Sequence, residues 1–116
     1  MNLPADLLQT IRDSDAKVRI GFPFWLRPFL IRSVDAITIR RHVYVAREIE
    51  QRELEALLRH ELTHVRQMIA IGFVRFCWRY VVEYARNRRA GFSSQDAYRR
   101  ISFEQEAEAA ENIVDV

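Results

Sequence analysis

The chain has 116 residues, a formal net charge of +2 and a single cysteine. This length fits one domain with one hydrophobic core, and so small a charge gives no strong signal for nucleic acid. One cysteine excludes an intrachain disulfide and a cysteine-based zinc cluster. We therefore expect a single compact domain over residues 1–116, in a reducing compartment such as the cytoplasm.

The N-terminal third combines helical, strand-like and irregular patterns. Apolar residues at helical spacing predict a helix over residues 3–11, and residues 18–22 favour a short strand. The apolar stretch 21–31 contains two prolines and an arginine, and is too short to span a membrane. It either covers the core as a loop or rests on a membrane surface. The aromatic anchors for the second case would be Phe22, Phe24, Trp25 and Phe29.

Two β-prone triplets follow, at residues 37–39 and 43–45, on either side of Arg40-Arg41-His42. This pattern predicts a small hairpin or one irregular edge strand. From Gln51 onward the spacing of apolar residues becomes helical, and Gly72 is expected to break the helix. The apolar stripe of this helix consists of Leu54, Leu58, Leu62, Val65 and Ile69.

The C-terminal part is expected to be wholly helical. A second helix is predicted over residues 73–88, and a short one, capped by Ser93 or Ser94, through Tyr98. Ser102 is expected to cap the last helix, over residues 103–113, with Gln105 at the capping-box position. The stretch 68–82 is apolar but holds two arginines, so no transmembrane span is expected. The sequence therefore predicts an α+β, mostly helical fold.

One helical turn carries the motif His60-Glu61-x-x-His64. Residues four apart project from the same face of a helix, so the two imidazoles can bind one cation, and zinc accepts such nitrogens. Glu61 is rotated by about 100° from His60, which places it beside the metal rather than on it. There it can act as the base for a water whose pKa zinc lowers to about 7. The alternative is a helix with two surface histidines.

A third protein ligand has to come from elsewhere in the chain. His42 is one candidate, with a solvent-facing strand residue as the alternative. The acidic segment 102–111 is the better source, because Glu104, Glu108 and Glu111 share one helical face. Its alternative is a solvated acidic helix. Periodicity does not choose between Glu104 and Glu108.

These residues resemble the gluzincin zinc metallopeptidases, in which HExxH is followed by a glutamate on a later helix. The segment 103–108 is similar to the Glu-x-x-Ala-Asp segment of CAAX-type membrane endopeptidases and of the small soluble minigluzincins. The resemblance implies that Glu104 is the third zinc ligand and that Glu108 supports a histidine, where the family often has aspartate. It extends over about residues 37–111, with Val65 and Gln67 also similar to small bacterial domains of this group, and leaves residues 1–33 unmatched.

The resemblance also implies a zincin-like core and a function. Residues 37–45 would be the edge strand that lies against an extended peptide or unfolded protein substrate. The reaction would be hydrolysis of a peptide bond by a zinc-bound water, with Glu61 as general base. Tyr98 is the first candidate for stabilising the oxyanion, before Arg99, Tyr84 and Tyr80. For each of these four, packing or surface charge is the alternative.

Other readings remain open at this point. The chain could be a protein-interaction module in which zinc only holds the fold together, and either kind of protein could be membrane-peripheral. Pairing through the edge strand could give a homodimer. Cys77 is expected to be a buried small hydrophobe, with capping of the zinc as the alternative. Aromatic residues at helical spacing, namely Phe73, Phe76, Tyr80 and Tyr84, are expected in the core.

Overall fold

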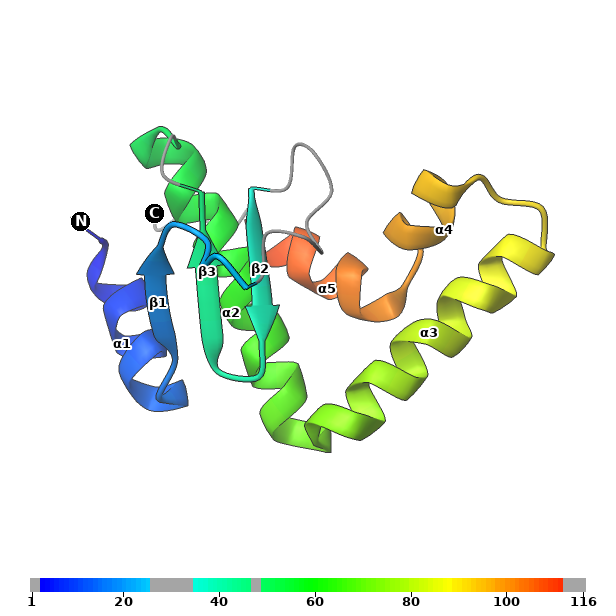
Figure 1. Ribbon diagram of the computed structural model, residues 1–116, viewed down its shortest axis with the longest axis horizontal. Helices are drawn as coiled ribbons and strands as arrows, with labels where there is room; N and C mark the ends of the chain where they lie inside the picture. Colours follow the sequence, from blue (N-terminus) through cyan, green and yellow to red (C-terminus); the bar gives the residue numbers. More distant parts are fainter. Residues whose placement is uncertain (1–2, 26–34, 47–48, 112–116) are drawn as a thin grey trace.

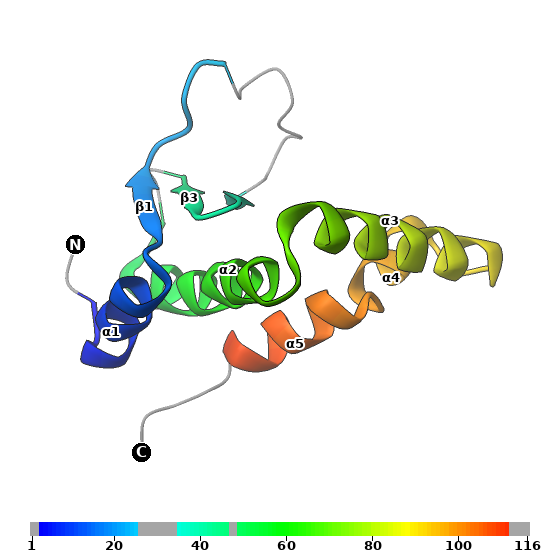
Figure 2. The same ribbon diagram turned by 90° about the horizontal axis from the view of Figure 1, so that it is seen from below.

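The computed structural model describes residues 3–25, 35–46 and 49–111. A small sheet packs against a long central helix, and the C-terminal helices continue from one end of that helix, the last of them returning to pack against it (Figure 1, Figure 2). The α+β, mostly helical class is therefore confirmed. The elements in chain order are α1 (Ala5–Ser14), β1 (Lys17–Ile20), β2 (Ala36–Ile39), β3 (His42–Val45), α2 (Gln51–Ile71), α3 (Phe73–Arg89), α4 (Ser94–Arg99) and α5 (Ser102–Glu111).

The predicted hairpin is present, because β2 and β3 pair antiparallel through a turn at Arg40 and Arg41. Arg40 adopts a left-handed conformation with φ 56°, which such tight turns require. The strand order is β1-β3-β2, with β1 parallel to β3. β3 is thus the central, most buried strand, and β2 is an edge strand whose outer side no described strand pairs.

The N-terminal core joins α1, the sheet and α2. Its buried residues are Leu7, Val43, Val45, Leu54, Leu58, Leu62 and Val65. This confirms the predicted stripe of α2 except at Ile69, which is 46% exposed. Figure 1 shows α2 continuing past the hairpin turn at the end of the sheet, and Met68, one position earlier, is the buried residue at this end of the helix.

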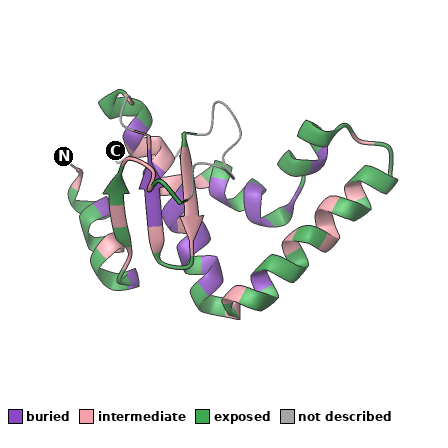
Figure 3. Ribbon diagram, in the orientation of Figure 1, coloured by how far each residue is buried: buried purple, intermediate pink, exposed green. Residues whose placement is uncertain are grey.

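A second, smaller core lies between the end of α2, α3 and α5. Its buried members are Met68, Phe76, Ile101 and Phe103, and Phe73, Tyr80 and Tyr84 pack against them. The expected core position of the α3 aromatics is confirmed. Cys77 was wrongly expected to be buried: it is exposed, one position beyond the buried Phe76. Most of α3 is exposed (Figure 3), since only one of its faces meets other helices.

Caps and breaks position the C-terminal helices. Gly72, at φ 90°, forms the corner between α2 and α3, and Ser93 caps α4 by accepting a hydrogen bond from the Asp96 N–H. The prediction that Ser102 caps α5 is wrong, because Ser102 is the first residue of that helix. The Ser102 N–H and hydroxyl instead donate hydrogen bonds to the carboxylate of Glu83 on α3, at 3.0 Å and 2.9 Å. The start of α5 is therefore fixed from a neighbouring helix.

The apolar N-terminal stretch is described only as far as Trp25. Phe24 is 82% exposed and Trp25 50% exposed, while Trp25 meets the Tyr44 ring edge-on at 6.3 Å between centroids. Phe29, and the predicted end of the last helix at residue 113, lie outside the described residues. Within the described ranges, no helix has both the length and the apolar character needed to cross a membrane.

Candidate metal centre

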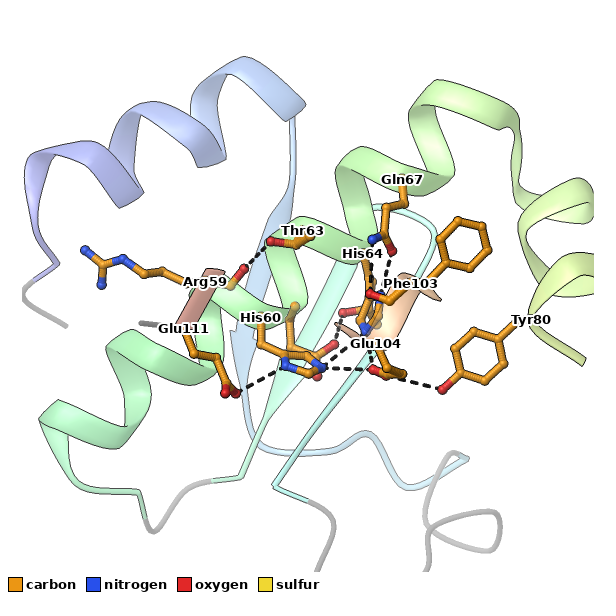
Figure 4. Close-up of polar contacts among 11 residues, drawn as sticks. Arg59, His60, Thr63, His64, Gln67, Tyr80, Phe103, Glu104 and Glu111 are labelled. Atoms are coloured by element: carbon orange, nitrogen blue, oxygen red, sulfur yellow. Dashed lines mark hydrogen bonds and ion pairs between the residues drawn. The ribbon is translucent and has the colours of Figure 1, made fainter. Parts of the chain in front are cut away.

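Two helices bring three potential metal ligands together. α2 presents His60 and His64 toward α5, which places the Glu104 carboxylate between them (Figure 4). Glu104 Oε1 lies 3.0 Å from His60 Nε2 and 2.7 Å from His64 Nε2, and the two Nε2 atoms are 3.2 Å apart. The three residues expected as metal ligands therefore lie close together, in an arrangement compatible with metal binding.

The spacing of these atoms suits a single ion. Two nitrogens that each lie roughly 2.0–2.1 Å from a tetrahedral ion are about 3.3 Å apart. The observed Nε2–Nε2 separation of 3.2 Å is close to that value, and the two nitrogen–oxygen distances are slightly shorter. The donor set, two imidazoles and one carboxylate, therefore fits a divalent metal with modest outward adjustment.

Burial and charge act together on these groups. Burial alone would raise the pKa of Glu104, but hydrogen bonds from the two histidines lower it to about 2. Burial opposes the charged form of His60 and His64, yet the bond to Glu104 and its negative charge raise the pKa of both imidazoles. Without a metal, the site therefore favours protonated histidines around an ionised carboxylate.

Affinity for a divalent metal is expected to fall as the pH is lowered. Metal and protons compete for the same imidazole nitrogens, and the raised pKa values of His60 and His64 make this competition begin at a higher pH than for free histidine. At a pH below the pKa values of both histidines, the affinity should fall by up to about 100-fold per pH unit, because each imidazole must lose one proton before the metal binds. Titrations against a competing chelator at pH 6, 7 and 8 measure this. A constant affinity over that range would contradict it.

Side chains around the ligands orient them. His64 Nδ1 lies 2.9 Å from Gln67 Oε1, and the Gln67 amide donates to the Phe103 carbonyl oxygen at 3.1 Å (Figure 4). The carbonyl fixes the amide orientation of Gln67, so its oxygen must accept from the His64 Nδ1–H. When His64 loses its second proton, as metal binding requires, this leaves the neutral tautomer with its lone pair on Nε2, on the side of Glu104.

The carboxylate beside His60 is Glu111 and not Glu108. Glu111 Oε1 lies 3.2 Å from His60 Nδ1, within ion-pair distance although outside hydrogen-bond geometry. Glu108 is exposed and forms no ion pair with either histidine in the described structure. By helical geometry Glu111 is about 20° from Glu104 around the axis, against about 40° for Glu108. Glu111 also lies two helical turns beyond Glu104 along α5, which brings it beside His60.

Replacing Glu111 by glutamine is expected to weaken metal binding by about tenfold, because carboxylates that support ligating histidines contribute about 10–100-fold to metal affinity. Glu108→Gln makes the same chemical change one helical turn earlier and should leave the affinity unchanged. Competition titrations of both variants measure the difference. An equal effect of the two substitutions would remove Glu111 from this role.

Glu61 is held next to the ligands by the sheet. Its side chain is 8% exposed, and Oε2 accepts a hydrogen bond of 2.5 Å from the Thr38 hydroxyl on β2. Its carboxylate is not among the three groups that converge on the metal position. Glu61 therefore lies beside the three candidate ligands rather than among them. Thr38 is a residue that sequence analysis missed, because only the pairing of β2 with β3 brings it over α2.

Two tyrosines flank the carboxylate of Glu104. The Tyr80 hydroxyl donates to Glu104 Oε2 at 3.3 Å, and Tyr98 on α4 also interacts with Glu104. Loss of hydration and the nearby negative charge raise the pKa of both phenols, so they keep their protons. Tyr84 instead bonds Ser94, and Arg99 is exposed. Tyr80 therefore joins Tyr98 as a hydrogen-bond donor at the site.

A cleft of about 280 Å³ opens over these groups. β2 forms one wall, with Thr38, and α3 forms the other, with Cys77 and Tyr80. Glu61, His64 and Glu104 lie in the same cleft. His42 is half-buried in β3, stacks on Tyr44 and does not join the ligand group.

Comparison with known proteins gives one match. A family model described as the eCIS core domain matches residues 32–70. This segment includes the β2–β3 hairpin and α2 as far as Ala70, with both histidines and Glu61, but not α3, α4 or α5. No curated protein and no solved structure gives a significant match. The chain is therefore similar to the eCIS core domain over less than half of its length, and the segment that carries Glu104 lies beyond the match.

Proposed function

We propose that the protein is a zinc-dependent metallopeptidase of the gluzincin type. The observation that carries the proposal is the convergence of His60, His64 and Glu104 beside a carboxylate, Glu61, that is not part of the ligand group. Three protein ligands leave a position open on a tetrahedral ion, as catalytic zinc sites do, whereas structural sites fill all four positions with protein. This favours an enzyme over an interaction module with structural zinc.

Zinc bound by these ligands would supply a Lewis acid that lowers the pKa of water and polarises a carbonyl. Glu61 then takes a proton from the attacking water as the oxygen–carbon bond forms. It passes that proton to the leaving amine as the carbon–nitrogen bond breaks. The Thr38 hydroxyl keeps the Glu61 carboxylate turned toward the cleft. Tyr98 and Tyr80, which keep their protons and lie beside Glu104, would be the donors to the developing oxyanion.

The outer side of β2 suits an extended peptide. The Ala46 N–H bonds the Asp35 carbonyl, and antiparallel pairing alternates, so the main-chain groups of Ala36 and Thr38 point away from β3. They border the cleft that holds Glu61 and Glu104. A substrate strand added there would place its main chain beside the zinc ligands, which supports peptide rather than small-molecule hydrolysis.

The test is hydrolysis of internally quenched peptides by protein loaded with one zinc per chain. We expect cleavage that a chelator abolishes and added zinc restores. Loaded protein that cleaves no member of a diverse peptide panel would contradict the proposal. The Glu61→Gln variant separates hydrolysis by this site from a contaminating protease.

A further inference from the structure

A second hollow adjoins the cleft at the turn of the hairpin. It has a volume of about 760 Å³ and lies between that turn, the end of α2 and the start of α3. Met68 lines both hollows, and α3 forms a wall of each. Figure 1 shows the hairpin turn beside the α2–α3 corner. A peptide lying along β2 would therefore run from the cleft into this second hollow.

Three arginines line this hollow, and no acidic residue does: Arg40, Arg41 and Arg75. We call it the arginine pocket. Arg41 is partly neutralised by Asp15 at 3.5 Å, with both side chains largely exposed. Arg40 lies over the Phe73 ring at 5.0 Å, and neither Arg40 nor Arg75 forms an ion pair within the described part of the chain. At least two guanidinium groups are thus available to an anion.

The rest of the pocket wall is apolar and accessible. Trp78 is 69% exposed and Val74 78% exposed, although both are large hydrophobic residues on a regular helix. Guanidinium groups bind carboxylates through paired hydrogen bonds, and an adjoining apolar wall suits the stem of the same side chain. The pocket volume is within the range of ligand sites, roughly 300–1,000 Å³.

We infer that the arginine pocket selects peptides with an acidic side chain near the cleaved bond. The inference rests on the proposed function, because it takes the substrate to lie along β2. Thr38 contacts Glu61, and Arg40 follows two residues later on the same chain segment. At about 3.3 Å per residue of strand, the pocket begins about 7 Å along the chain from Thr38, the residue that bonds the Glu61 carboxylate. The acidic residue is therefore two or three positions from the scissile bond, on one side only.

The test measures binding rather than cleavage. Zinc-loaded Glu61→Gln protein is titrated into fluorescent ten-residue peptides that carry Glu-Glu on one side of an apolar centre, Glu-Glu on the other side, or Gln-Gln on both. We expect one of the two acidic peptides to bind about tenfold more tightly than the glutamine peptide. The difference should shrink as salt is raised, because exposed charges are screened.

Substitutions in the same background locate the effect. Arg40→Gln and Arg75→Gln should each remove most of the preference, and Arg75→Glu should abolish it, because the new carboxylate would pair with a remaining arginine. Arg86→Gln changes an exposed arginine of α3 outside the pocket and should leave the preference intact. Equal binding of all peptides, or an equal loss in Arg86→Gln, would overturn the inference.

Two further arms separate the outcomes. If Arg75→Gln abolishes binding to anionic lipid vesicles while peptide preference is unchanged, the pocket belongs to a membrane surface and the inference is wrong. The parent protein is assayed for cleavage in parallel. Preference without cleavage contradicts only the proposed function, whereas cleavage without preference contradicts only the role of the arginine pocket.

Discussion

Replacing Glu61 by glutamine is expected to abolish peptide hydrolysis while the protein still binds one zinc. The amide keeps the size of the carboxylate and can still accept the Thr38 hydrogen bond, and Glu61 is not among the metal ligands. It cannot take a proton from water. General-base catalysis contributes about 10²–10⁴-fold, so kcat/KM should fall by that factor. Elemental analysis gives the zinc content, and quenched peptides give kcat/KM.

Glu53→Gln is the matched control, since Glu53 is an exposed glutamate in the first turn of the same helix. It should retain both zinc and activity. Unchanged hydrolysis by a Glu61→Gln protein with full zinc content would show that Glu61 is not the base. Loss of zinc together with activity would place Glu61 among the ligands instead.

Replacing Glu104 by glutamine is expected to have the largest effect on the metal. The substitution removes the carboxylate that lies against both histidines and is 3% exposed. Zinc affinity should fall by at least about 100-fold, more than for a group that only supports a ligand. At saturating zinc, that loss removes about 2.7 kcal/mol of metal-derived stability. Competition titration and the zinc-induced rise in Tm measure the two effects.

Glu106→Gln provides the comparison on the same helix, because Glu106 is exposed and faces away from the histidines. It should bind zinc like the parent protein. The metal-free Glu104→Gln protein also loses a buried ion pair, so its Tm without zinc has to be measured separately. Tight zinc binding by Glu104→Gln would show that the third ligand is another residue.

The positions of the helices could be predicted from the sequence because each has a local cause. The apolar stripe of α2, the break at Gly72 and the cap at Ser93 are encoded within a few residues of where they act. The two histidines and Glu61 are encoded in one helical turn. Local patterns were insufficient where a distant element decides the outcome, as when Glu83 of α3 takes over the capping of α5.

The surroundings of the metal position show the same limit. The prediction of Glu104 as third ligand depends on the resemblance, because helical periodicity alone does not distinguish Glu104 from Glu108. The choice between Glu108 and Glu111 depends on how far α5 extends beside α2, which no local pattern contains. Thr38 and Tyr80 reach the site only through hairpin pairing and the packing of α3. The zincin-like character of the core and the identity of the metal as zinc remain predictions.

The two hydrophobic cores give metal binding a mechanical consequence. One core ties α1 and the sheet to α2, and the other ties α3 and α5 to the end of α2. The ligands span the two ends of the C-terminal half, since His60 and Glu104 are 44 residues apart. An ion between them would act as a clasp that closes this long loop. Its removal should leave α5 held to α2 by packing alone, so the amide hydrogens of α3, α4 and α5 should exchange faster than those of the sheet, and metal supply would govern the rigidity of this half of the protein.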